Sequence, residues 1–164
     1  MRTKRLLLGL AAAAASLATA VATTGSAQAA VPADHAPAAR ILKAPPAPAG
    51  AETVSALGAA ATSPGISPYA RSIHVPANSD FPCGSGNLCT MVWDPTKSMW
   101  EVFYLYDCNR YYLSDWLGTG KYFNNQTGNP TSYFYDGGGN VINSFRPPAS
   151  GSQNWDPVWS IRNC

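Results

Sequence analysis

The chain has 164 residues, of which 11 are basic and 9 acidic, giving a formal net charge of +2 at pH 7. Arg2, Lys4 and Arg5 lie at the N-terminus, so the rest of the chain has 8 basic against 9 acidic residues. This balance lacks the basic patch of a nucleic-acid-binding protein and the polybasic cluster that binds anionic lipid. We therefore expect neither nucleic acid nor a membrane among the partners.

The first 29 residues have the composition of a secretory signal peptide. A positive N-terminus precedes an apolar run from Leu6 to Val21, and Ala27-Gln28-Ala29 has the small-x-small pattern of a signal-peptidase site. A transmembrane helix is the alternative, but small and polar residues interrupt the run and no positive cluster follows it. The sequence predicts cleavage after Ala29 and a secreted, extracellular protein.

Residues 30–79 differ in composition from the rest of the chain. Of these 50 residues 23 are Ala or Pro, and Tyr69 is the one aromatic residue. Such a segment buries too little apolar surface to offset the entropy of ordering it, which predicts a disordered leader or a removable pro-segment. Residues 80–164 hold all four Cys, all five Trp and 17 of the 18 aromatic residues, so we expect one small domain there.

Both histidines of the chain, His35 and His74, lie in the predicted leader. The predicted domain therefore has no histidine for a Ser/His or Cys/His nucleophile pair or for a zinc site. Its seven acidic residues are scattered, and no pair is spaced to suggest acid–base catalysis. A pair of glycosidase carboxylates far apart in sequence is the alternative. We expect a binding protein without a cofactor, not an enzyme.

The pattern of apolar residues and turns predicts an all-β domain. The predicted strands are Leu88–Trp93, Met99–Tyr106, Thr131–Tyr135, Val141–Phe145 and Val158–Arg162. Pro95 presets the backbone of the turn Asp94–Ser98, and the glycines of Asp136–Asn140 allow positive φ in the second hairpin. No window of helical length has a sustained 3.6-residue period, which favours a sandwich or a barrel.

An even number of cysteines in a small exported domain indicates two disulfides. The four residues are Cys83, Cys89, Cys108 and Cys164. A four-thiolate zinc site is the alternative, but the paired Cys-x-x-Cys spacing is absent. Four cysteines allow three pairings, and their spacing does not choose among them.

Two segments resemble the Greek-key motif of the βγ-crystallins. Cys108–Gly118, followed by Phe123-Asn124-Asn125, resembles the second half of that motif, and Asn154–Arg162 resembles a second copy. The resemblance implies a small, disulfide-linked Greek-key β-sandwich, in which two antiparallel sheets pack through aromatic and aliphatic side chains.

A closer resemblance is to secreted actinobacterial βγ-crystallin-like proteins of the metalloproteinase-inhibitor family. It is carried by Cys83–Cys89 together with Asn124–Gly128 and covers about residues 83–164. For such a domain we expect a Cys83–Cys89 disulfide that braces the entry loop. A Cys108–Cys164 disulfide would tie the C-terminus to the middle of the domain.

Crystallin-type motifs often bind calcium through Asn/Asp-Asn/Asp-x-x-Ser/Thr-Ser, and this sequence departs from that pattern. Asn124 and Asn125 match the first two positions, but Gly128 and Asn129 replace the hydroxyl residues. In the second copy Asp156 survives, while tryptophans occupy positions that should carry oxygen. Because calcium needs six to eight oxygen ligands, these Asn and Asp residues are weak candidates and we expect no metal.

The glycine-rich hairpin is the predicted binding loop. Its residues are Asp136, Gly137, Gly138, Gly139, Asn140, Val141 and Ile142. No Lys-Ser/Thr follows the glycines, so the loop is not a phosphate-binding loop. Val141 and Ile142 either fill the apolar pocket of a protease cleft or are ordinary strand residues. The turn Asp94–Ser98 is the second choice of loop.

Two functions follow from these observations. The resemblance implies a monomeric inhibitor of an extracellular metallo- or serine protease, whose rigid loop enters the cleft of its target. The alternative is a module that binds carbohydrate or the cell wall, with antimicrobial action as in killer-toxin-like crystallin folds. That alternative requires Trp100, Trp155 or Trp159 to be exposed for stacking on sugar rings, so their burial separates the two functions.

Overall fold

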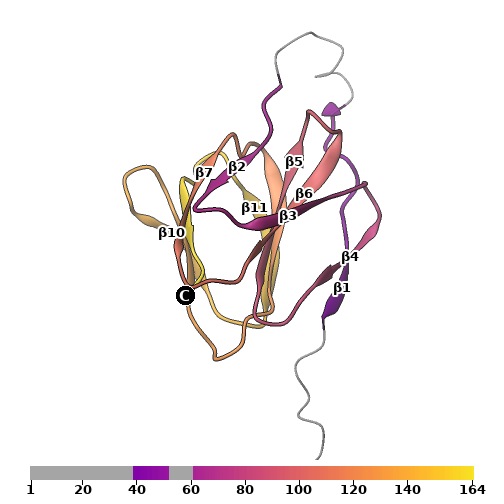
Figure 1. Cartoon of the computed structure of the whole chain (residues 1–164). Helices are drawn as coiled ribbons and strands as arrows, with labels where there is room; N and C mark the ends of the chain where they lie inside the picture. Colours follow the sequence, from indigo (N-terminus) through magenta and orange to yellow (C-terminus); the bar gives the residue numbers. More distant parts are fainter. Residues whose placement is uncertain (1–38, 52–60) are drawn as a thin grey trace, which may run out of the picture. The chain divides into compact units, whose positions relative to one another are not determined.

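The structure is a computed structural model that describes residues 39–51 and 61–164 (Figure 1). The predicted signal peptide, residues 1–29, and the start of the predicted leader lie outside the described residues. The described residues form two five-stranded sheets and a two-stranded ribbon, which confirms the prediction of an all-β protein. Their strands are β1 (Arg40–Lys43), β2 (Gly65–Ser67), β3 (Arg71–Val75), β4 (Asp80–Cys83), β5 (Leu88–Asp94), β6 (Met99–Leu105), β7 (Arg110–Ser114), β8 (Thr119–Asn124), β9 (Ser132–Tyr135), β10 (Val141–Phe145), β11 (Ala149–Asn154) and β12 (Ser160–Arg162).

Four of the five strands of each sheet come from two consecutive groups of four strands, β5–β8 and β9–β12. Sheet 1 has the order β11-β8-β5-β6-β3, and sheet 2 has the order β10-β9-β12-β7-β2. In each group the fourth strand returns to lie beside the first, while the third strand joins the other sheet. Thus β7 pairs antiparallel with β12, and β11 pairs antiparallel with β8, so each group completes the sheet of the other.

The main hydrophobic core lies between the inner faces of the two sheets. Alternate residues of β5 and β6, such as Leu88 and Leu105, pack there with Phe134 of β9 and Ile161 of β12, because successive side chains of a strand point to opposite faces. Trp155 is fully buried in this core, and its Nε1 donates a hydrogen bond to the carbonyl oxygen of Met91 at 2.8 Å.

A second core covers the outer face of sheet 1. The ribbon, which consists of the antiparallel strands β1 and β4, packs over this face. Phe81 and Cys83 of the ribbon lie in one cluster with Met91, Trp100 and Val102 of the sheet. The aromatic residues therefore serve mainly to fill two apolar layers.

The folded region begins well before residue 80, so the predicted boundary is wrong for the described part of the leader. Strand β2 pairs with β7, and β3 pairs with β6, as the fifth strand of each sheet. Two tryptophans of the predicted domain bind backbone carbonyls of this segment: Trp116 Nε1 donates to Gly65 at 2.9 Å, and Trp100 Nε1 donates to Pro45 at 3.0 Å.

The physical reason is that this segment adds to sheets that already exist. A leader that had to form its own core would need many apolar residues, whereas an added edge strand gains backbone hydrogen bonds and needs few. Val75 is buried, and Ile66 and Ile73 are partly buried against the two cores.

Two disulfides cross-link the strands, with the pairing expected from the sequence. Cys83–Cys89 joins β4 to β5, and Cys108–Cys164 joins the loop before β7 to the C-terminus. Among the described residues no helix has the length and apolar character needed to cross a membrane.

Candidate functional site

The loop between β9 and β10 is braced by the carboxylate of Asp136. Its Oδ1 accepts hydrogen bonds from the backbone N–H groups of Gly138 at 2.9 Å and Asn140 at 2.8 Å, and its Oδ2 accepts one from Asn140 Nδ2 at 2.9 Å. Hydrogen bonds from the Asn140 side chain and backbone, followed by those from the glycine backbone, lower the pKa of Asp136. Gly139 has a φ of +81°, which a residue with a side chain rarely adopts. The ionised carboxylate therefore braces the loop at neutral pH.

Exposed apolar side chains flank this loop. Val141 is 53% exposed, Ile142 39% and Trp159 64%; we call these three residues the edge cluster. A Cβ atom on Gly137 would lie 3.0 Å from Cε2 of Trp159, so the glycine allows the loop to approach the indole ring. A register shift between Val141 and Asn143 marks a β-bulge at the edge of sheet 2. Such a bulge re-aims the side chains beside it.

The outer face of sheet 2 carries aromatic and cationic groups. Tyr112 is exposed, and the guanidinium of Arg110 lies 4.0 Å from the centroid of the Tyr135 ring. Tyr133 stacks with Tyr135 at a centroid distance of 5.9 Å. Tyr, Trp and Arg are enriched in protein–protein interfaces, so this face has the composition of a docking surface.

The second predicted loop, Asp94–Ser98, does not present a free carboxylate. Asp94 is fully buried, and its Oδ1 accepts hydrogen bonds from Thr96 N at 2.8 Å and from Thr96 Oγ1 at 2.7 Å. Ser63 also donates to this carboxylate, with its Oγ 3.2 Å from Oδ2. This turn therefore belongs to a polar cluster within the fold.

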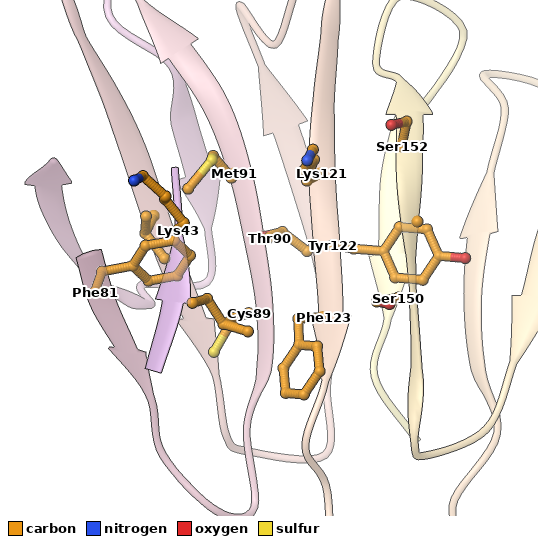
Figure 2. Close-up of a pocket in the computed structure, with 13 residues that line it drawn as sticks. Lys43, Phe81, Cys89, Thr90, Met91, Lys121, Tyr122, Phe123, Ser150 and Ser152 are labelled. Carbon is orange, nitrogen blue, oxygen red and sulfur yellow. The ribbon is translucent and has the colours of Figure 1, made fainter. Parts of the chain in front are cut away.

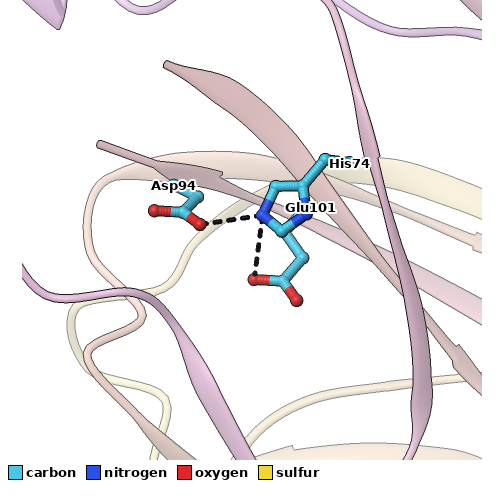
Figure 3. Close-up of side chains that lie close together, drawn as sticks. All are labelled: His74, Asp94 and Glu101. Carbon is cyan, nitrogen blue, oxygen red and sulfur yellow. Dashed lines mark hydrogen bonds and ion pairs between the residues drawn. The ribbon is translucent and has the colours of Figure 1, made fainter. Parts of the chain in front are cut away.

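That polar cluster consists of His74, Asp94 and Glu101 (Figure 3). The Nε2 atom of His74 lies 2.8 Å from Oδ2 of Asp94 and 3.8 Å from Oε2 of Glu101. His74 on β3 lies directly opposite Glu101 on the paired strand β6. Asp94 is the last residue of β5, which pairs with the other side of β6. The folded domain therefore contains a histidine, contrary to the prediction from the sequence, because β3 belongs to it.

The hydrogen bonds around Asp94 outweigh the effect of its burial. Burial alone would raise the pKa of this carboxyl group, but hydrogen bonds from Thr96, His74 and Ser63 together lower it below the usual value of 3.8. Asp94 is therefore an anion at neutral pH.

In the sequence, the alternating run Arg71–Val75 was the signal of a strand that would bring His74 into the sheet.

A groove of about 340 Å³ lies on the outer face of sheet 1 beside the ribbon (Figure 2). Met91, Val102 and Phe123 of the sheet and Phe81 of the ribbon give it apolar walls. Lysines from the ribbon and from β8 and serines from β11 add polar groups. The groove has the volume and composition of a small-molecule site, and no local sequence motif indicates it because its residues lie far apart in the chain.

The structure does not bring the three weak calcium candidates together. Asn124 ends β8, where its Oδ1 accepts a hydrogen bond from Gln126 N at 3.1 Å. Asn125 Nδ2 donates to the carbonyl oxygen of Cys83 at 3.0 Å. Asp156 accepts from the N–H of Gly118, which precedes the other end of β8, at 2.8 Å. These side chains hold separate loops in place.

The tryptophans do not form an exposed stripe. Trp100 and Trp155 are buried, at 2% and 0% exposure, and Trp159 is the exposed member of the three. A sugar-binding face built from all three is therefore excluded.

Comparisons with known proteins add no assignment. No family model, no curated protein and no solved structure matches the chain.

Proposed function

We propose that the chain is a secreted, monomeric βγ-crystallin-like protein that inhibits an extracellular metallo- or serine protease. In this proposal the loop Asp136–Ile142 enters the cleft of the protease, and the protein performs no chemistry of its own. The observation that carries the proposal is the combination of a carboxylate-braced loop with exposed apolar side chains beside it.

The chain topology supports the Greek-key part of the proposal. In a Greek key the fourth strand returns to lie beside the first, and this holds for β8 beside β5 and for β12 beside β9. The two halves thus have related strand orders, which agrees with the two motif copies in the sequence. The two disulfides support an oxidising, extracellular environment.

The loop has the physical properties that an inhibitor needs. Ordering a flexible loop on binding costs free energy, and the hydrogen bonds to Asp136 meet part of that cost before the partner arrives. Val141 and Ile142 supply apolar side chains that can fill specificity pockets of a protease, and a few such anchors normally carry most of the affinity.

A carbohydrate-binding function is the second candidate. It is favoured by the exposure of Trp159, at 64%, beside the β9–β10 loop and of Tyr112, at 59%, on β7. Aromatic rings of this kind can stack on sugar rings while their polar atoms stay hydrated. Burial of Trp100 and Trp155 leaves this function with a smaller surface.

One experiment separates the two candidates. The full chain is assayed against purified thermolysin-like and subtilisin-like proteases, and in parallel is sedimented with peptidoglycan and with chitin. We expect inhibition of at least one protease and no sedimentation. Sedimentation without inhibition of any protease would replace the inhibitor proposal with the carbohydrate-binding one.

A further inference from the structure

We infer that His74, Asp94 and Glu101 form a binding site for a divalent transition-metal ion such as Zn²⁺. One imidazole nitrogen and two carboxylate oxygens are a donor set that zinc accepts. The three donor atoms lie within 4.8 Å of one another, so one ion could contact all three at bond lengths of about 2.0–2.2 Å after small side-chain adjustments.

Each carboxylate is oriented so that one oxygen faces the imidazole. Ser72 Oγ donates to Oε1 of Glu101 at 2.7 Å, and Thr96 donates twice to Oδ1 of Asp94. The other oxygens, Oε2 and Oδ2, both lie near Nε2 of His74, as the converging dashed lines of Figure 3 show. In each carboxylate, one oxygen accepts hydrogen bonds that fix the side chain and the other lies beside the imidazole. Metal sites have the same arrangement, because hydrogen bonds from surrounding groups orient the ligands.

The second observation that points to a cation is the position of Oε2 of Glu101. This side chain is 9% exposed, and its Oε2 lies 3.8 Å from Nε2 of His74, which is too long for a hydrogen bond. Within residues 39–51 and 61–164 no hydrogen bond to this atom is present. Oε1 is held by Ser72, so Oε2 is the oxygen of this carboxylate that is free to ligate a cation.

The charge balance leads to the same conclusion. Asp94 and Glu101 are both buried, and in the described part of the chain no Lys or Arg forms an ion pair with either carboxylate. A divalent ion would balance the charge of two carboxylate ligands, and a histidine ligand is neutral when it binds a metal. The His74 side chain is 33% exposed, so an ion and completing water ligands can reach the site from solvent.

This site is separate from the proposed inhibitory loop, because it lies on sheet 1 and not on the β9–β10 hairpin. A bound ion would tie β3 to β5 and β6, which reinforces the segment that the sequence assigned to a leader. The expected role is therefore structural, and it does not depend on protease inhibition.

The test is a calorimetric titration of the chelator-treated full chain with Zn²⁺. We expect one ion per chain with a micromolar or tighter Kd, and a rise in melting temperature of about 5–10 °C at 100-fold excess over the Kd. Glu101→Gln keeps the side-chain shape, and it should weaken binding at least tenfold; His74→Gln should do the same. His35→Gln alters the only other histidine of the chain and should leave binding unchanged.

Two measurements keep the test valid if a variant folds poorly. Melting temperatures in chelator report the metal-free stability of each variant, and a shift of the His74 ring nitrogen resonance on Zn²⁺ addition reports ligation in the wild-type chain. A wild-type Kd weaker than about 100 μM, or binding that survives in His74→Gln and is lost in His35→Gln, would overturn the inference.

Discussion

Gly120→Ala is expected to destabilise the fold strongly, because a Cβ atom at this position has no room. It would lie 1.9 Å from the carbonyl oxygen of Met91 and 2.4 Å from Nε1 of Trp155. These are the two atoms of a buried hydrogen bond, so the methyl group would push the β5–β8 pair apart and break that bond.

The expected cost combines two effects. Overpacking of a core usually costs about 1–3 kcal/mol, and leaving a buried polar group without its partner costs about 1–3 kcal/mol more. We therefore expect a loss of about 2–6 kcal/mol in the free energy of unfolding, and a melting temperature lower by about 8–24 °C at about 4 °C per kcal/mol.

The assay is thermal unfolding followed by near-ultraviolet circular dichroism, which reports the packing of Trp155. Gly84→Ala is the matched control, because its Cβ would meet only the side-chain amide of Asn87, at 3.3 Å, and no backbone atom, and the expected change is below about 1 kcal/mol. If Gly120→Ala melts within about 3 °C of the wild type with an unchanged tryptophan signal, the packing argument is wrong.

Three further predictions follow from the structure. A chain that begins at residue 80 lacks β1, β2 and β3, so it should melt at least about 10 °C below one that begins at residue 39. Each buried apolar side chain that is lost costs about 1.5–3 kcal/mol. Equal melting temperatures would restore the boundary at residue 80. The pKa of Asp136 is lowered in the folded state, so the hydrogen bonds to its carboxylate should persist at pH values above the unfolded pKa of about 3.9 and disappear as the pH falls through the lower folded pKa. An NMR titration of the Gly138 and Asn140 amides should therefore show chemical-shift changes below about pH 4. Changes near pH 6 would contradict the bracing. Added calcium should raise the melting temperature by less than about 2 °C, because Asn125 and Asp156 already form hydrogen bonds to backbone groups. Micromolar calcium binding by calorimetry would contradict this, and Asn124, Asn125 and Asp156 would then be the first ligands to mutate.

The strands that the sequence predicted correctly are those with alternating apolar residues and a turn of recognisable chemistry. The hairpins β5–β6 and β9–β10 lie where Pro95 and the glycines of residues 136–140 indicated them. Strand β11, Ala149–Asn154, was missed because its small and polar residues carry no apolar alternation. Its backbone pairs with β8 along its full length, and that pairing depends on the sheet and not on local sequence.

The predicted loop could be identified from local sequence, whereas the polar cluster of His74, Asp94 and Glu101 could not. The residues Asp136 to Ile142 are contiguous, so turn chemistry alone identified the loop. His74 meets Asp94 and Glu101 only because β3 pairs with β6, and the Ala- and Pro-rich surroundings of His74 favoured a disordered leader. Long-range strand pairing of this kind leaves little trace in local composition.

The measurement that tests the central claim most directly is the inhibition constant of the full chain against the protease that it inhibits best. Val141→Ala and Ile142→Ala remove exposed anchor atoms, so each should raise the inhibition constant at least about fivefold, which corresponds to about 1 kcal/mol, with an unchanged melting temperature. Ile41→Ala is the control, because Ile41 is 66% exposed on β1 of the ribbon and should leave inhibition unchanged. Equal inhibition constants for wild type, Val141→Ala and Ile142→Ala would contradict the claim that this loop binds the protease.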